Sequence, residues 1–292
     1  MTPLRRLRYA LETVLVYTAY ILSRLMPLEM ASAAGGWVCR RIGPHLAASD
    51  TARKNLAAVF PEKTAVEREN IVTGMWDNLG RVMAEYAHLG HIEKNVSLSG
   101  HEYVIAARDS GKPSIFCGGH LANWEIPTVF AKSSGLDIYP VYRKPNNPGV
   151  DGLLRHARGA GAAGMIRKGA GGAREMLSVL KKNGALGILV DQKLNEGMAI
   201  PFFGRDAMTA PAIARFALHF SCPVYPLRVE RTEGAHFRMT IYPPLETPRT
   251  GNEEQDTRAM LTEINSMLEG WIRERPEQWL WIHRRWPDEA RP

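Results

Sequence analysis

Residues 114–126 read SIFCGGHLANWEI, and this stretch decides the expected fold. The apolar run at residues 114–117 predicts a short buried strand, Gly118 and Gly119 predict a tight exit, and residues 126–131 predict a helix. Pro127 fits a position near the start of that helix, because the first N–H groups of a helix have no intrahelical partner. We expect the helix to be capped near Asn123. A strand that turns into a helix in this way is typical of α/β domains.

The same stretch holds a histidine and a glutamate five positions apart, His120 and Glu125. At about 100° per residue, such positions in a straight helix point roughly 140° away from each other. The two side chains therefore meet only across a turn, which the predicted strand exit supplies. An imidazole accepts a proton near neutral pH, and a carboxylate behind it fixes the tautomer and stabilises the imidazolium. The pair is a candidate general base; the alternative is a structural histidine beside a glutamate that complements a helix dipole.

Strands and helices alternate after residue 114, whereas the first hundred residues are predominantly helical. The expected helices before the sheet cover residues 51–60 and about 65–89. The later strands are expected at 138–142, 185–190, 224–229 and 236–242, and the later helices at 174–181, 210–220 and about 254–273. This succession predicts an α/β domain with a mixed central sheet flanked by helices, in which functional residues lie at strand ends.

The N-terminal region predicts a contact with a membrane. Arg5, Arg6 and Arg8 precede a mostly apolar stretch at residues 9–26, interrupted by Glu12 and Arg24. This is near the ~20 residues that a spanning helix needs. A spanning helix, a helix lying on the bilayer and an amphipathic helix packed in a soluble core all remain open. We divide the chain into a membrane-anchoring helix at residues 1–30 and a second domain at 31–292 whose first part is helical.

The composition narrows the class of partner. The 292 residues contain 37 Lys and Arg against 30 Asp and Glu, a formal net charge of +7. This charge suits acidic phospholipid, an acidic protein or nucleic acid, but no recognised nucleic-acid module is present, and we expect no nucleic acid. Three widely spaced cysteines, Cys39, Cys117 and Cys222, argue against a disulfide framework. No ligand cluster with metal spacing is apparent, so no metal is expected.

Basic side chains follow one expected strand and also lie in a glycine-rich segment after it. Guanidinium groups suit phosphate and carboxylate oxygens because they donate two parallel hydrogen bonds. The alternative is a solvated basic face. Asp191, at the end of another expected strand, either orients an Arg or His or closes a turn. The basic positions are Arg143, Lys144, Arg155, Arg158, Arg167 and Lys168.

Several motifs, taken in order, resemble the late acyltransferases of lipid A biosynthesis, which use an H-x4-D/E motif. The resemblance covers nearly the whole chain. It implies a glycerolipid-acyltransferase-like α/β fold with an N-terminal membrane-associated helix, and makes residues 31–292 an acyltransferase domain. The motifs lie at residues 75–81 with Glu85, 119–125, 141–143, 165–168, 191–192, 201–204 and 281–286.

The resemblance implies transfer of a fatty acyl chain from an acyl carrier protein thioester, or acyl-CoA, to a hydroxyl of a lipid A precursor. His120 would remove the proton and Glu125 would orient and stabilise His120. Arg143 or Arg158 would hold phosphate or polarise the thioester carbonyl. Substrate contacts are also expected from Asn123, Arg167 and Asp191.

The same resemblance implies that the reaction needs no cofactor, and that the protein acts at the bacterial inner membrane with its catalytic domain on the cytoplasmic face. One alternative acceptor is a lysophospholipid or a glycolipid. A non-enzymatic alternative is a membrane-attached protein that binds anionic lipid, in which His120 and Glu125 are structural.

Overall fold

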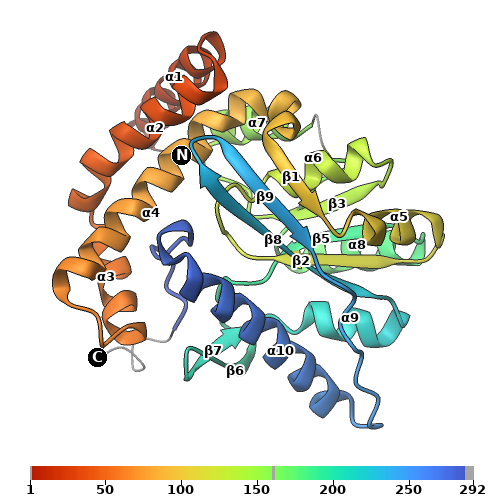
Figure 1. Ribbon diagram of the computed structural model, residues 1–292. Coiled ribbons are helices and arrows are strands. Elements are labelled where there is room, and N and C mark those ends of the chain that lie inside the picture. The colour runs from red at the N-terminus through yellow and green to blue at the C-terminus, as the bar shows by residue number, and fades with distance from the viewer. Residues whose placement is uncertain (1, 160–161, 287–292) are drawn as a thin grey trace.

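Seven strands form the central sheet in the computed structural model, which describes residues 2–159 and 162–286 (Figure 1). The sheet order is β1–β9–β8–β2–β5–β3–β4. Neighbours from β8 to β4 are parallel, β9 is antiparallel to β8, and β1 is parallel to β9. The predicted mixed sheet is therefore confirmed. The strands are β1 (Val96–Ser99), β2 (Ser114–Gly118), β3 (Ile138–Tyr142), β4 (Ile166–Arg167), β5 (Ala185–Leu189), β8 (Val224–Glu233) and β9 (His236–Ile241).

Strand β2 lies in the middle of the sheet, and all five of its residues are buried. A continuous apolar run suits such a strand, because both faces of a parallel sheet are covered. Ile115 and Cys117 belong to one core, and Phe116, pointing the other way, belongs to a second core. The sheet therefore separates two apolar layers, and β2 contributes to both.

Helices cover both faces of the sheet. The first core includes side chains from α8, α9 and α10, and the second includes side chains from α5, α6 and α7. Helices α1 to α4 line one side of the molecule (Figure 1). The helices are α1 (Pro3–Leu25), α2 (Leu28–Ile42), α3 (Ala48–Val59), α4 (Ala65–Glu85), α5 (His101–Asp109), α6 (Ile126–Ser133), α7 (Pro148–Arg158), α8 (Ala170–Lys181), α9 (Ala212–Phe220) and α10 (Glu253–Glu274), with 3₁₀ segments η1 (Gly43–His45), η2 (Tyr86–Asn95) and η3 (Pro276–Gln278).

The predicted helices and strands are all present, with shifted ends. The expected helix at 65–89 is α-helical only to Glu85 and continues as η2. The helix after β2 has Glu125 as its N-cap residue, without a side-chain capping hydrogen bond, and Asn123, two residues earlier, accepts from the Glu125 N–H at 3.1 Å. The pattern missed β1, β4, α5 and a separate antiparallel hairpin of β6 (Met198–Phe202) and β7 (Arg205–Thr209). These elements are short, so periodicity identifies them poorly.

Helix α1 is amphipathic and ends before Pro27. Leu7, Leu11 and Leu15 are exposed, whereas Tyr9 is buried. The Thr13 hydroxyl contacts the Asn147 side chain at 3.1 Å, so α1 is attached to the start of α7. Across residues 2–159 and 162–286, no helix combines the length and hydropathy needed to cross a bilayer. The membrane contact of residues 1–30 stays a prediction.

A buried ion pair between Glu85 and Arg231 joins α4 to β8. Arg231 Nη1 and Nη2 donate to the two Glu85 oxygens at 2.5 and 3.0 Å. Ser32 Oγ and Asn123 Nδ2 donate to the same carboxylate at 2.7 and 2.8 Å. Glu85 is fully buried, and these four hydrogen bonds compensate its lost hydration. Through Asn123, the pair also anchors the loop that follows β2.

Replacing Glu85 with alanine is expected to destabilise the protein by about 3–5 kcal/mol, because Arg231 is left as an uncompensated buried charge. Urea unfolding would measure the loss. Glu69→Ala is the matched control, since Glu69 pairs with Arg53 at the surface and such pairs contribute about 0–1 kcal/mol. A similar small loss in both variants would contradict this account of the network.

Candidate active site

The carboxyl ends of four adjacent parallel strands meet at one edge of the sheet. His120 follows β2 and Asp191 follows β5, which is the neighbour of β2. Arg143 follows β3, and Lys168 follows β4. Ligands in open α/β sheets bind outside the carboxyl ends of the strands. This edge is therefore the candidate site, as the sequence predicted for residues at strand ends.

The carboxylate that holds His120 is Asp191. Its Oδ1 lies 2.7 Å from His120 Nδ1, and its Oδ2 accepts from the His120 backbone N–H at 2.7 Å. Trp279 Nε1 donates to Oδ2 at 2.8 Å. Burial alone would raise the pKa of Asp191, but the charge and hydrogen bonds of His120, together with the Trp279 hydrogen bond, outweigh it and hold that pKa below its usual range. Asp191 is therefore an ionised carboxylate at neutral pH.

This contact determines what the His120 ring can do. A carboxylate at Nδ1 requires the ring proton there, which leaves Nε2 as the proton acceptor. The Gln192 side-chain nitrogen lies 3.4 Å from Nε2, and the Trp124 ring packs edge-on against the imidazole at 5.2 Å. The ring is 17% exposed. The geometry therefore leaves Nε2 as the nitrogen of His120 that can accept a proton.

The structure corrects the expected pairing of His120 with Glu125. Both Glu125 oxygens are engaged elsewhere: Arg158 donates to them at 2.6 and 2.7 Å, and the Tyr86 hydroxyl donates at 2.5 Å. The backbone turns at Ala122, where φ is +45°, and carries Glu125 toward α7 and η2. Two separate pairs, His120 with Asp191 and Glu125 with Arg158, replace the single predicted pair.

Asn123 and Asp191 are also placed differently from expectation. Both were expected to touch substrate, but both are buried with their polar atoms occupied. Asn123 Nδ2 donates to Glu85, and its Oδ1 accepts from the Glu125 backbone N–H at 3.1 Å. Asp191 orients His120, which was one of the two alternatives considered for it. These two side chains shape the site rather than contact a ligand.

The remaining predicted cations differ in how far they are neutralised. Burial would lower the pKa of Arg158, but Glu125 and Tyr86 raise it, so the guanidinium is fixed in an ion pair. Arg143 and Arg167 are exposed. Arg167 lines an open cleft with Tyr142 and Arg155. The structure therefore leaves Arg143 and Arg167 accessible to an anion, while Arg158 is tied to Glu125.

Sequence reasoning missed the contribution of the chain's last segment. Gln278 accepts from the Ala122 N–H through its backbone oxygen at 3.0 Å, and Trp279 contacts Asp191 as described above. His283 Nε2 accepts from the Lys193 N–H at 2.8 Å. The tryptophan- and arginine-rich run at 281–286 is one of the motifs that carry the resemblance. Its composition was the available signal, because buried Trp side chains with a polar atom seek a partner.

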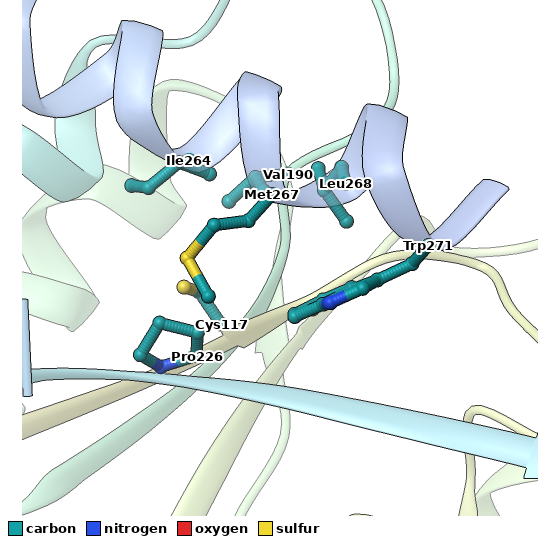
Figure 2. A pocket seen from close by; sticks show the side chains of 8 residues that line it. Cys117, Val190, Pro226, Ile264, Met267, Leu268 and Trp271 are labelled. Carbon is teal, nitrogen blue, oxygen red and sulfur yellow. The ribbon is translucent and has the colours of Figure 1, made fainter. Parts of the chain in front are cut away.

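A small apolar cavity lies between α10 and the sheet, next to the ends of β2 and β5 (Figure 2). Cys117, Val190 and the α10 side chains Met267 and Trp271 are among its lining residues. Burial raises the pKa of the Cys117 thiol to about 12, so Cys117 is a neutral core residue. A Cβ on Gly119 would lie 3.1 Å from Leu268 Cδ2 and 3.3 Å from Asp191 Oδ2. Glycine therefore lets α10 and Asp191 approach the loop closely.

Within the described ranges, no group of three or more His, Cys, Asp or Glu side chains is placed to hold a metal ion. The site instead consists of a carboxylate-oriented histidine at the edge of a mixed sheet, with basic side chains on the neighbouring strand ends. In an α/β protein, a histidine oriented in this way can accept a proton, and exposed cations beside it can contact an anion.

Comparison with known proteins identifies the family. The profile of the bacterial lipid A biosynthesis acyltransferases matches residues 1–288. The chain belongs to this family and is an acyltransferase, which confirms the expected resemblance.

Its relatives include three named enzymes. A lipid A biosynthesis acyltransferase of Haemophilus influenzae is 26% identical over 79% of this chain and 73% of its own length. The lipid A biosynthesis myristoyltransferase of Escherichia coli K12 is 26% identical, with coverages of 82% and 76%. The palmitoleoyltransferase of the same organism is 26% identical, with coverages of 80% and 77%.

Asp191→Asn is expected to lower kcat by roughly 10²–10⁴-fold, because an amide neither stabilises the imidazolium nor enforces the Nδ1–H tautomer of His120. Steady-state kinetics would measure this loss. Asp256→Asn is the control, since Asp256 is also buried but accepts hydrogen bonds from Thr250, away from the site. Unchanged kcat in Asp191→Asn would overturn the orienting role.

The same carboxylate predicts a pH dependence of stability. Its folded pKa is depressed below the unfolded value of about 3.9, so its contribution is present above that value and is lost as pH falls toward the folded pKa. The contribution of the Asp191 carboxylate, measured as the difference in unfolding free energy between wild type and Asp191→Asn, should shrink as pH falls below about 4. Chemical denaturation across pH 3–5 tests this; a difference that grows below pH 4 would contradict it.

Proposed function

We propose that this protein transfers a fatty acyl chain from the thioester of acyl carrier protein, or from acyl-CoA, to a hydroxyl of a lipid A precursor. The observation that carries the proposal is the His120 ring, which is fixed through Nδ1 by Asp191 and presents Nε2 at the carboxyl edge of the sheet. Family membership supports acyl transfer, and the names of the relatives support a lipid A acceptor.

In the proposed reaction, His120 Nε2 removes the proton of the acceptor hydroxyl. The hydroxyl oxygen attacks the thioester carbonyl carbon at the same time. Asp191 stabilises the imidazolium that forms. The C–S bond then breaks, and the leaving thiolate takes the proton from His120. The acyl group passes directly from the thioester to the acceptor oxygen, and no acyl-enzyme intermediate forms. Gln192, 3.4 Å from Nε2, lies next to the position that the acceptor hydroxyl would occupy.

The proposal gives Glu125 a positioning role. Its carboxylate fixes Arg158 through two hydrogen bonds, and both side chains belong to a cluster closed by Tyr86. Burial, with Glu125 adding to it, raises the pKa of Tyr86 well above its usual value, so Tyr86 stays a neutral hydroxyl donor. Because Glu125 holds Arg158 in place, Arg158 can polarise a thioester carbonyl only at one fixed position in the site. Arg143, which is exposed, is the freer candidate for a phosphate contact.

The proposal also places the protein on the cytoplasmic face of the bacterial inner membrane. Leu4, Leu15 and Leu25 on α1 are 80%, 71% and 77% exposed, and Trp37 on α2 is 50% exposed. Exposed apolar helix faces flanked by arginines suit the interface of an anionic bilayer. Membrane contact through α1 and α2 would bring the lipid acceptor to the site.

The function is tested by incubating the purified chain with acyl carrier protein thioester and, separately, a lipid A precursor, a lysophospholipid and a glycolipid. Mass spectrometry should detect an acylated lipid A precursor. His120→Ala should lower turnover by roughly 10²–10⁴-fold, the usual contribution of a positioned base. His219→Ala on the exposed face of α9 is the matched control.

Two outcomes would overturn parts of the proposal. Transfer only to the lysophospholipid or the glycolipid would reject the lipid A precursor as acceptor. Turnover retained in His120→Ala would reject the general base.

A further inference from the structure

We infer that Arg143 and Lys168 form a binding site for a phosphate ester beside His120, on the face of the sheet that α10 covers. The inference rests on the proposed function and deepens it, because it assigns a specific pair of ligands to the anionic part of a substrate. It also separates this pair from Arg155 and Arg167, which lie around the cleft on the other face.

The register of β3 and β4 places the pair. Val141 lies beside Ile166, and both pack with the core that includes α10. Tyr142 lies beside Arg167, and the Tyr142 ring contacts Arg158 on the other face. The Lys168 N–H donates to the Tyr142 carbonyl at 2.8 Å and continues this pairing. Because side chains alternate along strands, the next pair, Arg143 and Lys168, shares the face of Val141 and Ile166.

Arg143 and Lys168 make no direct ion pair with a described carboxylate. Neither Arg143 nor Lys168 has a side-chain hydrogen bond or ion pair within the described residues. Partial desolvation lowers the pKa of Lys168, with Arg143 and Arg285 adding to it and Asp191 opposing it. Both Asp191 oxygens, however, already accept from His120 and Trp279. An incoming dianion would therefore relieve repulsion among cations without displacing a salt bridge.

A buried arginine behind the pair strengthens the case. Arg285 is 0% exposed, and it donates to the Met208 carbonyl at 2.9 Å and to Thr209 Oγ1 at 2.8 Å. Its Nε has no partner in the part of the chain that the structure describes. Burial lowers the pKa of Arg285 to about 10, with Asp191 opposing, so the guanidinium remains charged at neutral pH. Within residues 2–159 and 162–286 no carboxylate forms a hydrogen bond or ion pair with Arg285, and a buried cation in that position is stabilised when an anion binds nearby.

His283 adds a neutral donor to the same region. Burial lowers its pKa to about 4, with His120, Arg285 and Lys168 adding to the effect and Asp191 opposing it. Its Nε2 accepts from the Lys193 N–H, so the neutral ring carries its proton on Nδ1. His283 and Arg285 thus both lie close enough to Lys168 to interact with it electrostatically.

The phosphate ester has two possible sources in the proposed reaction: a phosphate on the acceptor lipid, or the phosphate of the donor's pantetheine-type arm. The test pairs Lys168→Met with removal of the phosphate from one substrate at a time. The acceptor arm compares a phosphorylated lipid A precursor with its dephosphorylated form. The donor arm compares acyl-CoA with the acyl-pantetheine thioester, which has no phosphate.

Lys168→Met is expected to raise KM for the substrate that carries the bound phosphate by roughly ten- to a hundredfold, as for loss of one charge-assisted hydrogen bond. With the matching dephosphorylated substrate, wild type and variant should have equal KM. Lys168→Arg should retain most of the affinity. Lys181→Met, which removes the same charge from the exposed end of α8, should leave KM unchanged.

An equal loss on all four substrates would overturn the site, because it would indicate a general electrostatic effect; so would no loss on any of them. A separate readout does not depend on turnover. Inorganic pyrophosphate should raise the thermal midpoint of wild type and not that of Lys168→Met. If wild type transfers no acyl chain, the proposed function fails, and the pyrophosphate titration still decides the anion site. Normal transfer without that shift, and without the KM effect, would overturn the anion site alone.

Discussion

The buried Asp191 carboxylate is the constraint on which the site depends. An ionised group without water must be compensated by donors, and its donors come from His120 and Trp279, parts of the chain far apart in sequence. The same hydrogen bonds fix the loop after β2, the imidazole ring and the start of the C-terminal segment. The charge that orients the His120 ring thus also determines how three chain segments assemble around it.

The sequence of residues 120–125 suggests one catalytic pair. In the structure, three residues of this motif are held by three different partners. His120 is held by Asp191 on the neighbouring strand end, Asn123 by Glu85 on α4, and Glu125 by Arg158 on α7. Each support is charged, Asp191 and Glu85 are buried and Arg158 is partly buried, so each is costly to break. The spacing of the motif therefore reflects a loop that must reach three different carboxylate or guanidinium groups, rather than a contact between its own first and last members.

This division explains what could and could not be predicted from the sequence. The apolar run of β2 and the alternation of later elements are local patterns, and they gave the sheet, its flanking helices and the placement of His120 at a strand end. The pairing of His120 with Asp191 depends on β5 lying beside β2, an adjacency that no local pattern encodes. Likewise, the burial of Asn123 depends on Glu85 and Arg231, which approach it only in the folded chain. Sequence spacing favours Glu125 as the partner of His120 because the two are close in the chain. In the fold, the order of the strands places the buried Asp191 carboxylate beside His120 instead.

The two cation sets around His120 differ in one physical respect, and the difference separates their roles in the proposed mechanism. Arg158 forms an ion pair with Glu125 at hydrogen-bond distance, and this pairing fixes its position. Arg143 and Lys168 have no such partner among the described residues, and their like charges repel each other. A paired cation is suited to holding geometry, because its position is set before substrate arrives. Unpaired cations at an exposed edge are suited to binding an anion, because no ion pair within the protein must first be broken.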